Sequence, residues 1–366
     1  MPAVSHEDFV PWVNYHLSVG EPKGQDLEPQ LQVERLGRVH VADLEGQEIE
    51  RFAATAEMFW DHLVGVRTLM AYKAKLKQLG EPPRPFPLAL TGRGWSFSDV
   101  VGAARGKPCP AMLILDGLSG AVLLKQEQKE QSFKKTPIAM VGGGTRLREL
   151  AHWASREKLS IINSGTHLGA TIAGAIGTAT HGSRLDRGGL QDMVHGLHLV
   201  TGINQSVWIE RKSRPVLTEA AKEQLSADRK TCRLVRCDEM FKDALVHLGC
   251  MGIVNAVAVE LEPEESFDRL HLDQAIDGGW LTNIANGNWE VISKAFNRQN
   301  DYPVFYELTI NPDNWDGPSA LHTAYFKAHS SDGASSLSGI VSLADSIGDG
   351  ENSSRFSCML MTKYNR

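Results

Sequence analysis

The sequence predicts a two-domain α+β protein. Three observations support this: the length, a series of strand-loop-helix units before residue 263, and a change of composition after it. The chain has 366 residues, of which 42% are hydrophobic, and this suggests two domains at about 150 residues each. Beyond Pro263 the composition shifts toward tryptophan, and later toward Ser, Gly and Asp over 329–354. We predict a domain boundary near residue 263.

Charge and hydropathy exclude several classes of partner. The 38 basic and 44 acidic residues give a formal net charge of −6, so no broad positive field is expected for nucleic acid or an anionic membrane. No apolar run reaches the roughly 18 residues of a membrane span, and the first residues lack the basic start and apolar core of a signal peptide. We therefore expect a water-soluble, cytoplasmic protein with neither nucleic acid nor membrane as partner.

The cysteines indicate reduced thiols. There are five, an odd number spread over a long chain, which is not typical of a disulfide framework. Cys232 and Cys237 are the closest pair, but four residues separate them and no second pair follows, so a zinc site is not expected. We predict no metal.

The sequence before the first glycine-rich loop divides into three parts. Residues 1–53 are polar and irregular and form an N-terminal extension. Residues 54–79 are expected to be helical because apolar residues recur there at steps of three and four: Phe59, Leu63, Val66 and Met70. The proline-rich stretch 81–87 then ends the helix, since proline cannot continue it.

Short apolar runs then predict strands at 86–90, 111–116, 120–124, 138–141 and 159–162. A helix beginning near Leu147 separates the last two, because apolar residues there share one helical face: Leu147, Leu150, Ala151 and Ala154. Later, residues 246–261 are expected to form a glycine-flanked turn that leads into an alternating strand, and residues 304–310 are expected to form another strand. Units of this kind place loops and helix N-termini at strand ends, where ligands often bind.

The stretch 164–183 is unusually rich in small residues. Its twenty residues include five Gly, four Thr, four Ala and two Ser. Small side chains leave backbone N–H groups uncovered and hydroxyls add donors, so the segment suits close contact with an anion. The alternative is a buried segment whose small residues permit tight helix–sheet packing. A second loop of this type, 91–99, favours a large ligand whose diphosphate is held from two sides.

The more familiar nucleotide motifs do not fit. The run Gly142–Gly144 lies between a strand and a helix, but its spacing is not G-x-G-x-x-G and no acidic residue follows at the expected distance. No G-x-x-x-x-G-K-[ST] phosphate loop occurs. A dinucleotide site of another kind is therefore the better hypothesis.

Four segments together resemble one family. They are Gly92–Asp99 (GRGWSFSD), Val141–Leu150 (VGGGTRLREL), Thr171–Ser183 (TIAGAIGTATHGS) and Leu248–Val254 (LGCMGIV). In this order they are similar to the motifs of the vanillyl-alcohol-oxidase, or PCMH-type, FAD-binding oxidoreductases, closest to the sugar-lactone and alditol oxidase branch. The resemblance covers about residues 86–262.

The resemblance implies a fold and a cofactor. The fold is a two-subdomain PCMH-type FAD-binding domain over 54–262, followed by a small cap or substrate domain over 263–366 that is shortened or diverged. FAD would lie with its pyrophosphate between the loops 92–99 and 171–182 and its adenine end near the backbone of Ile253. The cofactor-binding residues implied are Gly92, Arg93, Gly94, Trp95, Ser96, Phe97, Thr166, Thr171, Gly174, Gly177, Thr178, Thr180, His181, Gly182 and Ile253.

Trp95 departs from the family pattern. In relatives with covalent flavin, a histidine at this position attaches to the flavin, whereas an indole N–H is only a donor and has no free lone pair for such a bond. No cysteine in 164–183 offers another attachment, so we predict noncovalent FAD. His181 is expected to satisfy backbone or phosphate groups rather than to act as a base. His195 and His198 are expected to be sheet residues.

The part of the chain expected to bind substrate departs further from the family pattern than the cofactor loops do. Related oxidases carry Glu and Arg on a cap strand, and close over the flavin with a His-x-x-Trp-Gly-Lys-like segment that this chain lacks. The nearest candidate is Glu307, with no Arg two positions later. Glu307 is the catalytic or substrate-orienting candidate, and the alternative is a solvated surface residue.

The function implied is an FAD-dependent oxidoreductase, an oxidase or a dehydrogenase, that removes a hydride from a CH–OH group of a small polar substrate. The alternative is a flavin-binding protein whose oxidation chemistry is lost or redirected, such as a partner subunit or a biosynthetic enzyme, which leaves room for a protein partner. A third hypothesis is a nicotinamide-dependent reductase of the peptidoglycan-precursor type, which shares this FAD fold.

Overall fold

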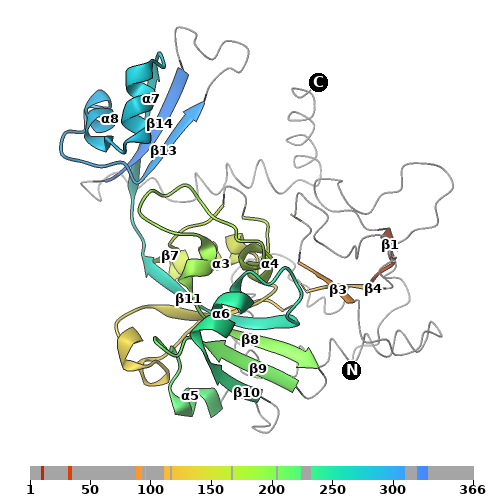
Figure 1. Cartoon of the computed structure of the whole chain (residues 1–366). Helices are drawn as coiled ribbons and strands as arrows, with labels where there is room; N and C mark the ends of the chain where they lie inside the picture. Colours follow the sequence, from red (N-terminus) through yellow and green to blue (C-terminus); the bar gives the residue numbers. More distant parts are fainter. Residues whose placement is uncertain are drawn as a thin grey trace, which may run out of the picture.

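The computed structural model describes residues 10–11, 32–34, 88–92, 95, 111–115, 118–165, 168–202, 205–223, 232–309 and 320–328. The helix predicted at 54–79 lies outside these residues. The described part contains three β-sheets with helices packed on two of them (Figure 1). The predicted α+β class is therefore confirmed.

A small, mostly parallel sheet contains the strand that leads into the first glycine-rich loop. Its strand order is β1-β2-β4-β3, and β4 pairs in parallel with both β2 and β3. The strands are β1 (Val10–Pro11), β2 (Gln32–Glu34), β3 (Leu88–Thr91) and β4 (Ala111–Ile114). The extension over 1–53, expected to be irregular, thus supplies two short strands of this sheet.

A seven-stranded sheet is the largest of the three described sheets. Its order is β10-β9-β8-β11-β6-β5, and β7 also pairs with β11. The strands are β5 (Ala121–Leu123), β6 (Ile138–Gly142), β7 (Leu159–Ile161), β8 (Val194–Gly202), β9 (Gln205–Glu210), β10 (Cys232–Arg236) and β11 (Ile253–Pro263). The first seven residues of β11 are buried because the strand is covered on both faces, which suits its continuous Val and Ala run.

Each face of this sheet carries its own apolar cluster. On one face pack α3 (Leu147–Arg156), α4 (Ile172–Gly177) and α6 (Asp238–Leu245). On the other face, Phe133 and Trp208 are fully buried in the second cluster. The segments on this face carry η2 (Gln126–Gln128), η3 (Gln131–Phe133) and α5 (Glu219–Glu223). A further short helix, η4 (Leu190–Met193), leads into β8.

The C-terminal part forms a separate three-stranded sheet with two helices, which we call the cap (Figure 1). Its order is β12-β14-β13, all antiparallel, and Trp280, Ile292 and Phe326 fill the space between sheet and helices. The elements are β12 (Phe267–Gln274), α7 (Gly278–Ala285), α8 (Trp289–Ala295), β13 (Phe305–Thr309) and β14 (Ala320–Lys327). The chain passes from the large sheet to the cap between Pro263 and Phe267.

A hydrogen-bonded chain fixes the interior of the cap. Trp280 Nε1 donates to the hydroxyl of Tyr306 at 2.9 Å, that oxygen lies 2.6 Å from His322 Nδ1, and His322 Nε2 lies 3.0 Å from the carbonyl oxygen of Gln274. Burial raises the pKa of Tyr306, so the phenol keeps its proton to donate to His322. Within the described ranges, no helix is both long enough and apolar enough to cross a membrane.

Candidate cofactor and substrate site

The two glycine-rich loops meet at the end of β3 and the start of α4. Gly92 follows β3, and its Cα faces Thr171 so closely that an added Cβ would overlap the Thr171 side chain. The Trp95 indole lies against Gly169 in the same way. A side chain on either glycine would therefore push the loops apart. Other predicted cofactor residues lie outside the described residues: Arg93, Gly94, Ser96, Phe97 and Thr166.

Backbone contacts hold the start of α4 in place. The amide of Ile172 donates to Thr145 O at 2.7 Å, and the amide of Ala173 donates to Gly143 O at 3.0 Å. The Thr171 side chain caps the helix by accepting from Gly174 N at 3.3 Å. The first amides of α4 thus have partners within the protein. A ligand at this loop would be contacted mainly by the exposed face of the segment rather than by the helix end.

That exposed face carries several of the predicted residues. Gly174 and Thr178 are exposed one helical turn apart, and the Thr178 hydroxyl donates to Gly174 O at 3.0 Å. His181 is also exposed, with its Nδ1 3.1 Å from the carbonyl oxygen of Gly182. The role of His181 in the cofactor loop stays a prediction. Gly174, Thr178 and His181 are thus the exposed positions among the predicted cofactor residues that the structure describes.

Glycine also sets the course of the chain after α4. An added Cβ on Gly182 would overlap the Asn163 side chain and Ser164 O, and one on Gly165 would lie 3.2 Å from the methyl group of Thr180. Asn163 is buried and donates from Nδ2 to Gly188 O at 2.7 Å. The segment 180–182 is thus fixed against the 163–165 loop, and small residues there reflect close packing as well as access to a ligand.

Ile253 is the residue whose backbone the resemblance places near the adenine end of FAD. It is buried and pairs with Val200 at the start of β11. The turn before it contains Gly249 at φ +77° and Gly252 at φ +113°, where an L side chain would be strained. This turn explains the glycine pattern of the LGCMGIV segment. The adenine position near Ile253 stays a prediction.

Gly177 has a packing role that the sequence did not indicate. Its buried Cα lies under the imidazole of His247, so that an added Cβ would be 2.8 Å from His247 Cε1. His247 itself is buried. The close approach of a ring to the end of α4 is a sufficient reason for glycine at this position.

A charged network connects the cofactor segment to β11. Arg184 Nη1 donates to Glu262 at 2.5 Å and to Ile162 O at 3.1 Å, and its Nε donates to Asp186 at 3.0 Å. Arg187 also contacts both carboxylates. The hydrogen bond from Arg184 is the main cause of the lowered pKa of Asp186. This network holds residues 184–187 beneath the cap.

The same segment contacts the cap directly. Arg184 forms an isolated antiparallel bridge with Phe305, and the amide of Leu185 donates to Val304 O at 2.8 Å. The Arg184 guanidinium also lies 6.0 Å from the centre of the Phe267 ring. The starts of β12 and β13 are therefore both close to the end of the predicted cofactor loop.

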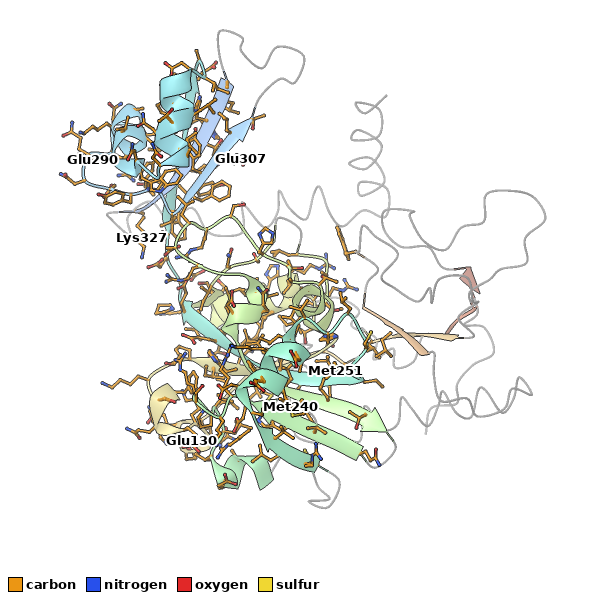
Figure 2. All side chains as sticks on the ribbon, in the orientation of Figure 1. Glu130, Met240, Met251, Glu290, Glu307 and Lys327 are labelled. Atoms are coloured by element: carbon orange, nitrogen blue, oxygen red, sulfur yellow. The ribbon has the colours of Figure 1, made fainter. Side chains whose placement is uncertain are left out.

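Glu307 lies on the cap face turned away from the helices. In Figure 2 it is on the opposite side of the cap from Glu290 of α8. The strand register places Glu307 opposite Thr323, and Thr323 opposite His271. His271 Nδ1 lies 3.1 Å from Thr323 Oγ1. We call His271, Thr323 and Glu307 the cap row. Thr309, the position at which the family resemblance implies an Arg, is exposed on the same face.

Nothing in the sequence indicated His247, Arg184 or His271 as residues of the candidate site. His271 occupies an alternating strand, whose exposed and half-buried residues follow period two, but only the register with β14 shows what lies beside it. His195 and His198 lie on β8, with His195 Nε2 2.6 Å from Glu260 and His198 Nδ1 3.2 Å from Asn255 Nδ2. Across the residues that the structure describes, no cluster of three His, Cys, Asp or Glu side chains could hold a metal.

Comparison with known proteins identifies the class of this domain. Residues 114–208 match a family model described as an FAD binding domain. They include β6, α3, α4, β8 and the small-residue segment between them. The resemblance to the PCMH-type FAD-binding proteins is confirmed, and FAD is the cofactor that this domain binds.

Curated relatives point to one branch of that class. The chain is 29% identical over 123 residues to an alditol oxidase from a Streptomyces species, covering 34% of this chain and 24% of that protein. It is 26% identical over 225 residues to a D-arabinono-1,4-lactone oxidase from Kluyveromyces lactis, covering 61% of this chain and 36% of that protein. The chain thus matches about a third or less of the length of these relatives.

Solved structures support the fold. A cholesterol oxidase from Brevibacterium sterolicum, as its His121Ala mutant, superposes with a TM-score of 0.51 at 11% identity, covering 87% of this chain and 47% of that one. A second structure of that enzyme gives a TM-score of 0.51 at 11% identity, covering 89% and 50%. These likenesses concern the arrangement of elements.

The described residues fit FAD. Gly92 and Gly169 allow two loops from different parts of the chain to approach closely, and the exposed Gly174–Thr178 face lies beside them. A side chain at Gly92 would overlap Thr171, so this close approach of the two loops requires glycine. Such a junction of small residues suits a pyrophosphate, because backbone and hydroxyl groups can reach its oxygens without steric hindrance.

Proposed function

We propose that this protein is an FAD-dependent oxidoreductase that removes a hydride from a CH–OH group of a small polar substrate. The support comes from the FAD binding domain and from relatives named alditol oxidase and D-arabinono-1,4-lactone oxidase. The observation that carries the proposal is the contact between the end of the cofactor segment and the cap strand of Glu307, made by the Arg184–Phe305 bridge.

The chain's own residues hold the cofactor noncovalently. The loops at Gly92–Trp95 and 171–182 would enclose the pyrophosphate, and Trp95 would pack near the flavin ring. An indole cannot form the bond that a histidine makes at this position. Bound FAD supplies hydride acceptance, and the protein supplies position and electrostatics.

The cap row would face the substrate. A carboxylate accepts hydrogen bonds from hydroxyl groups and an imidazole can donate or accept, so Glu307 and His271 suit a substrate with several hydroxyls. Their strands are both neighbours of β14, so their backbones lie roughly 10 Å apart. That distance leaves room for a short polyol or sugar lactone over Thr323. Glu307 would orient the reacting hydroxyl, and its proton would pass to a group of this row.

Anaerobic flavin reduction tests the proposal. The holoprotein is mixed without oxygen with alditols, sugar lactones, hydroxy acids and amines, and the flavin absorbance is followed. Bleaching by a polyol or lactone supports the proposal. No bleaching across the panel, with the flavin still reducible by dithionite, would overturn it and favour a flavin-binding protein with lost or redirected chemistry. Rapid bleaching by NADPH alone would favour the nicotinamide-dependent reductase.

One observation favours the alternative of a flavin-binding protein with redirected chemistry. In the described part of β13, the residue two positions after Glu307 is Thr309, so this strand does not supply the Arg that relatives carry. A redirected activity would use the same FAD domain with a different cap. The NADPH and polyol arms of the experiment above separate these possibilities, because each predicts a different reductant.

Location and partners are proposed on simpler grounds. Cys232, Cys237 and Cys250 are free, as expected of thiols in the cytoplasm. The acidic net charge favours neither nucleic acid nor an anionic membrane as partner. A small-molecule substrate is the partner we propose, and the short match to the curated relatives leaves room for a protein partner.

A further inference from the structure

His247 lies between α4 and the 248–252 turn, two parts of the chain that the FAD prediction places beside the cofactor. Its ring packs on Gly177 at the end of α4, and the amide of Leu248 donates to Gly177 O at 3.1 Å. On the other side, the amide of Gly249 donates to His247 Nδ1 at 2.9 Å. The ring thus contacts both α4 and the turn that leads to Ile253.

These contacts define the protonation state of the imidazole. Nδ1 accepts a hydrogen bond from a backbone amide, so it must carry a lone pair, and the neutral ring then carries its proton on Nε2. A second proton on Nδ1 would face the Gly249 N–H, abolishing that hydrogen bond and adding repulsion. Nε2 is buried. The arrangement therefore exists only with a neutral histidine.

The surroundings contain no compensating charge among the described neighbours. The sequence of α4, IAGAIG, has no titratable side chain. In the turn, the Cys250 thiol is exposed and directed at Leu248 O. On α6, Lys242 and Asp243 are both exposed. Burial is the main cause of the lowered pKa of His247, and the backbone of Ala173 opposes it to a smaller extent.

We infer that His247 is a positioning residue for FAD: in its neutral form it fixes α4 against the 248–252 turn, so that the exposed Gly174–Thr178 face and the start of β11 stay aligned along one cofactor. The inference rests on the FAD assignment of these loops but not on the identity of the substrate. Protonation of His247 would release the turn from α4 and weaken FAD binding. FAD affinity should therefore fall as the pH drops below the ordinary histidine range.

Two substitutions separate this role from simple packing. Asn at 247 can place an amide oxygen where Nδ1 now lies and accept from Gly249 N–H, but it does not titrate. His247→Ala removes the acceptor at every pH. His152→Asn is the control, because His152 is an exposed histidine on α3 outside the α4–turn contact.

The experiment measures FAD release from the holoprotein by recovery of flavin fluorescence, at about pH 7.5 and about pH 5.5, on either side of the ordinary histidine pKa. For the unsubstituted protein and His152→Asn we expect the dissociation constant for FAD to be about tenfold higher at the lower pH, because protonation of His247 abolishes its hydrogen bond with the Gly249 amide. His247→Ala should bind FAD about tenfold more weakly at both values. His247→Asn should match the unsubstituted protein at the higher pH and show little change at the lower one.

Two results would overturn the inference: an acid-induced loss of FAD from His247→Asn equal to that of the unsubstituted protein, or tight FAD binding by a folded His247→Ala protein. If His247→Ala does not fold, the pH dependence of FAD release from His247→Asn still supports or overturns the inference. Failure of the proposed oxidation would leave these FAD measurements unaffected, because no substrate is added.

Discussion

The backbone of Gly92 lies against the side chain of Thr171, and a methyl group on Gly92 would overlap the Thr171 hydroxyl and crowd its Cγ2 at 2.8 Å. This single contact joins the end of β3 to the N-cap of α4, which are 79 positions apart in the sequence. It brings together the two loops that the sequence assigns to the FAD pyrophosphate.

Substitution of Gly92 should weaken FAD binding. Gly92→Ala forces β3 and α4 apart because Thr171 is buried and also caps α4. We expect at least about a tenfold loss of FAD affinity, equivalent to about 1.4 kcal/mol, measured by equilibrium titration with fluorescence. Gly278→Ala is the matched control, since an added Cβ there meets nothing within 4 Å. Equal affinities for the two variants would contradict the proposed junction.

The flavin should separate from the denatured chain. Trp95 cannot form a bond to the flavin ring through its indole nitrogen, so acid precipitation should leave all FAD in the supernatant. The mass of the denatured polypeptide should be that of the chain alone. A polypeptide heavier by one FAD would show that another residue attaches the cofactor and that the noncovalent prediction is wrong.

Much of the FAD domain could be predicted because its signals are local. The strand at 138–141 and the helix from Leu147 were expected from apolar periodicity, and they correspond to β6 and α3. The glycine run after β6 was expected not to be a Rossmann motif. In the structure, added Cβ atoms on Gly143 and Gly144 would overlap Val254 O and Leu115 O, so these glycines serve close packing.

Other features depend on distant partners and could not be predicted. The small residues of 164–183 suggested either an anion-binding loop or a tightly packed segment. In α4, Ile172 and Ile176 are fully buried, as tight packing requires, while Gly174 and Thr178 are exposed and accessible to a ligand. His247 belongs to an unremarkable run before a turn, and only its contact with Gly177, 70 residues earlier, shows its role. The partners of Glu307 likewise depend on strand register.

The cap row should control substrate use without affecting the cofactor. Glu307→Gln removes the carboxylate and His271→Asn removes the imidazole that face the proposed substrate. We therefore expect at least about a tenfold lower rate of flavin reduction per unit of polyol concentration. FAD content should be unchanged. Glu290→Gln is the control because Glu290 is exposed on α8. A loss of activity in all three variants would argue against a specific role for the row.

Glu210 should be essential for stability. It is fully buried, and it accepts from Trp208 Nε1 at 3.0 Å, from the amides of Val216 and Leu217 at 3.1 and 3.2 Å, and from Arg236 Nε at 2.7 Å. Glu210→Ala leaves these donors without an acceptor, so the free energy of unfolding should fall by about 3 kcal/mol or more.

Glu219 provides the comparison for Glu210. It also pairs with Arg236, but 74% of its side chain is exposed, so Glu219→Ala should lower the free energy of unfolding by less than about 1 kcal/mol. Urea unfolding measures both variants. Equal losses of unfolding free energy in the two variants would show that burial of Glu210 does not increase its contribution to stability.

Stability should also decrease in acid through Glu260. The hydrogen bond from His195, 2.6 Å away, is the main cause of its lowered pKa, against the opposing effect of burial. A carboxylate with a lowered pKa contributes stability above its unfolded pKa, and this contribution is lost as the pH falls through the folded value. Glu260→Gln should therefore be less stable near neutrality and should lose less on acidification. A parallel pH profile for both proteins would contradict this.

The most direct test of the central claim is an experimental structure of the protein with FAD. The account predicts that the FAD pyrophosphate lies between the Gly92–Trp95 loop and residues 171–182, with the flavin end toward the cap row and the adenine end toward Ile253. FAD bound elsewhere, or a pyrophosphate that contacts neither loop, would contradict the account.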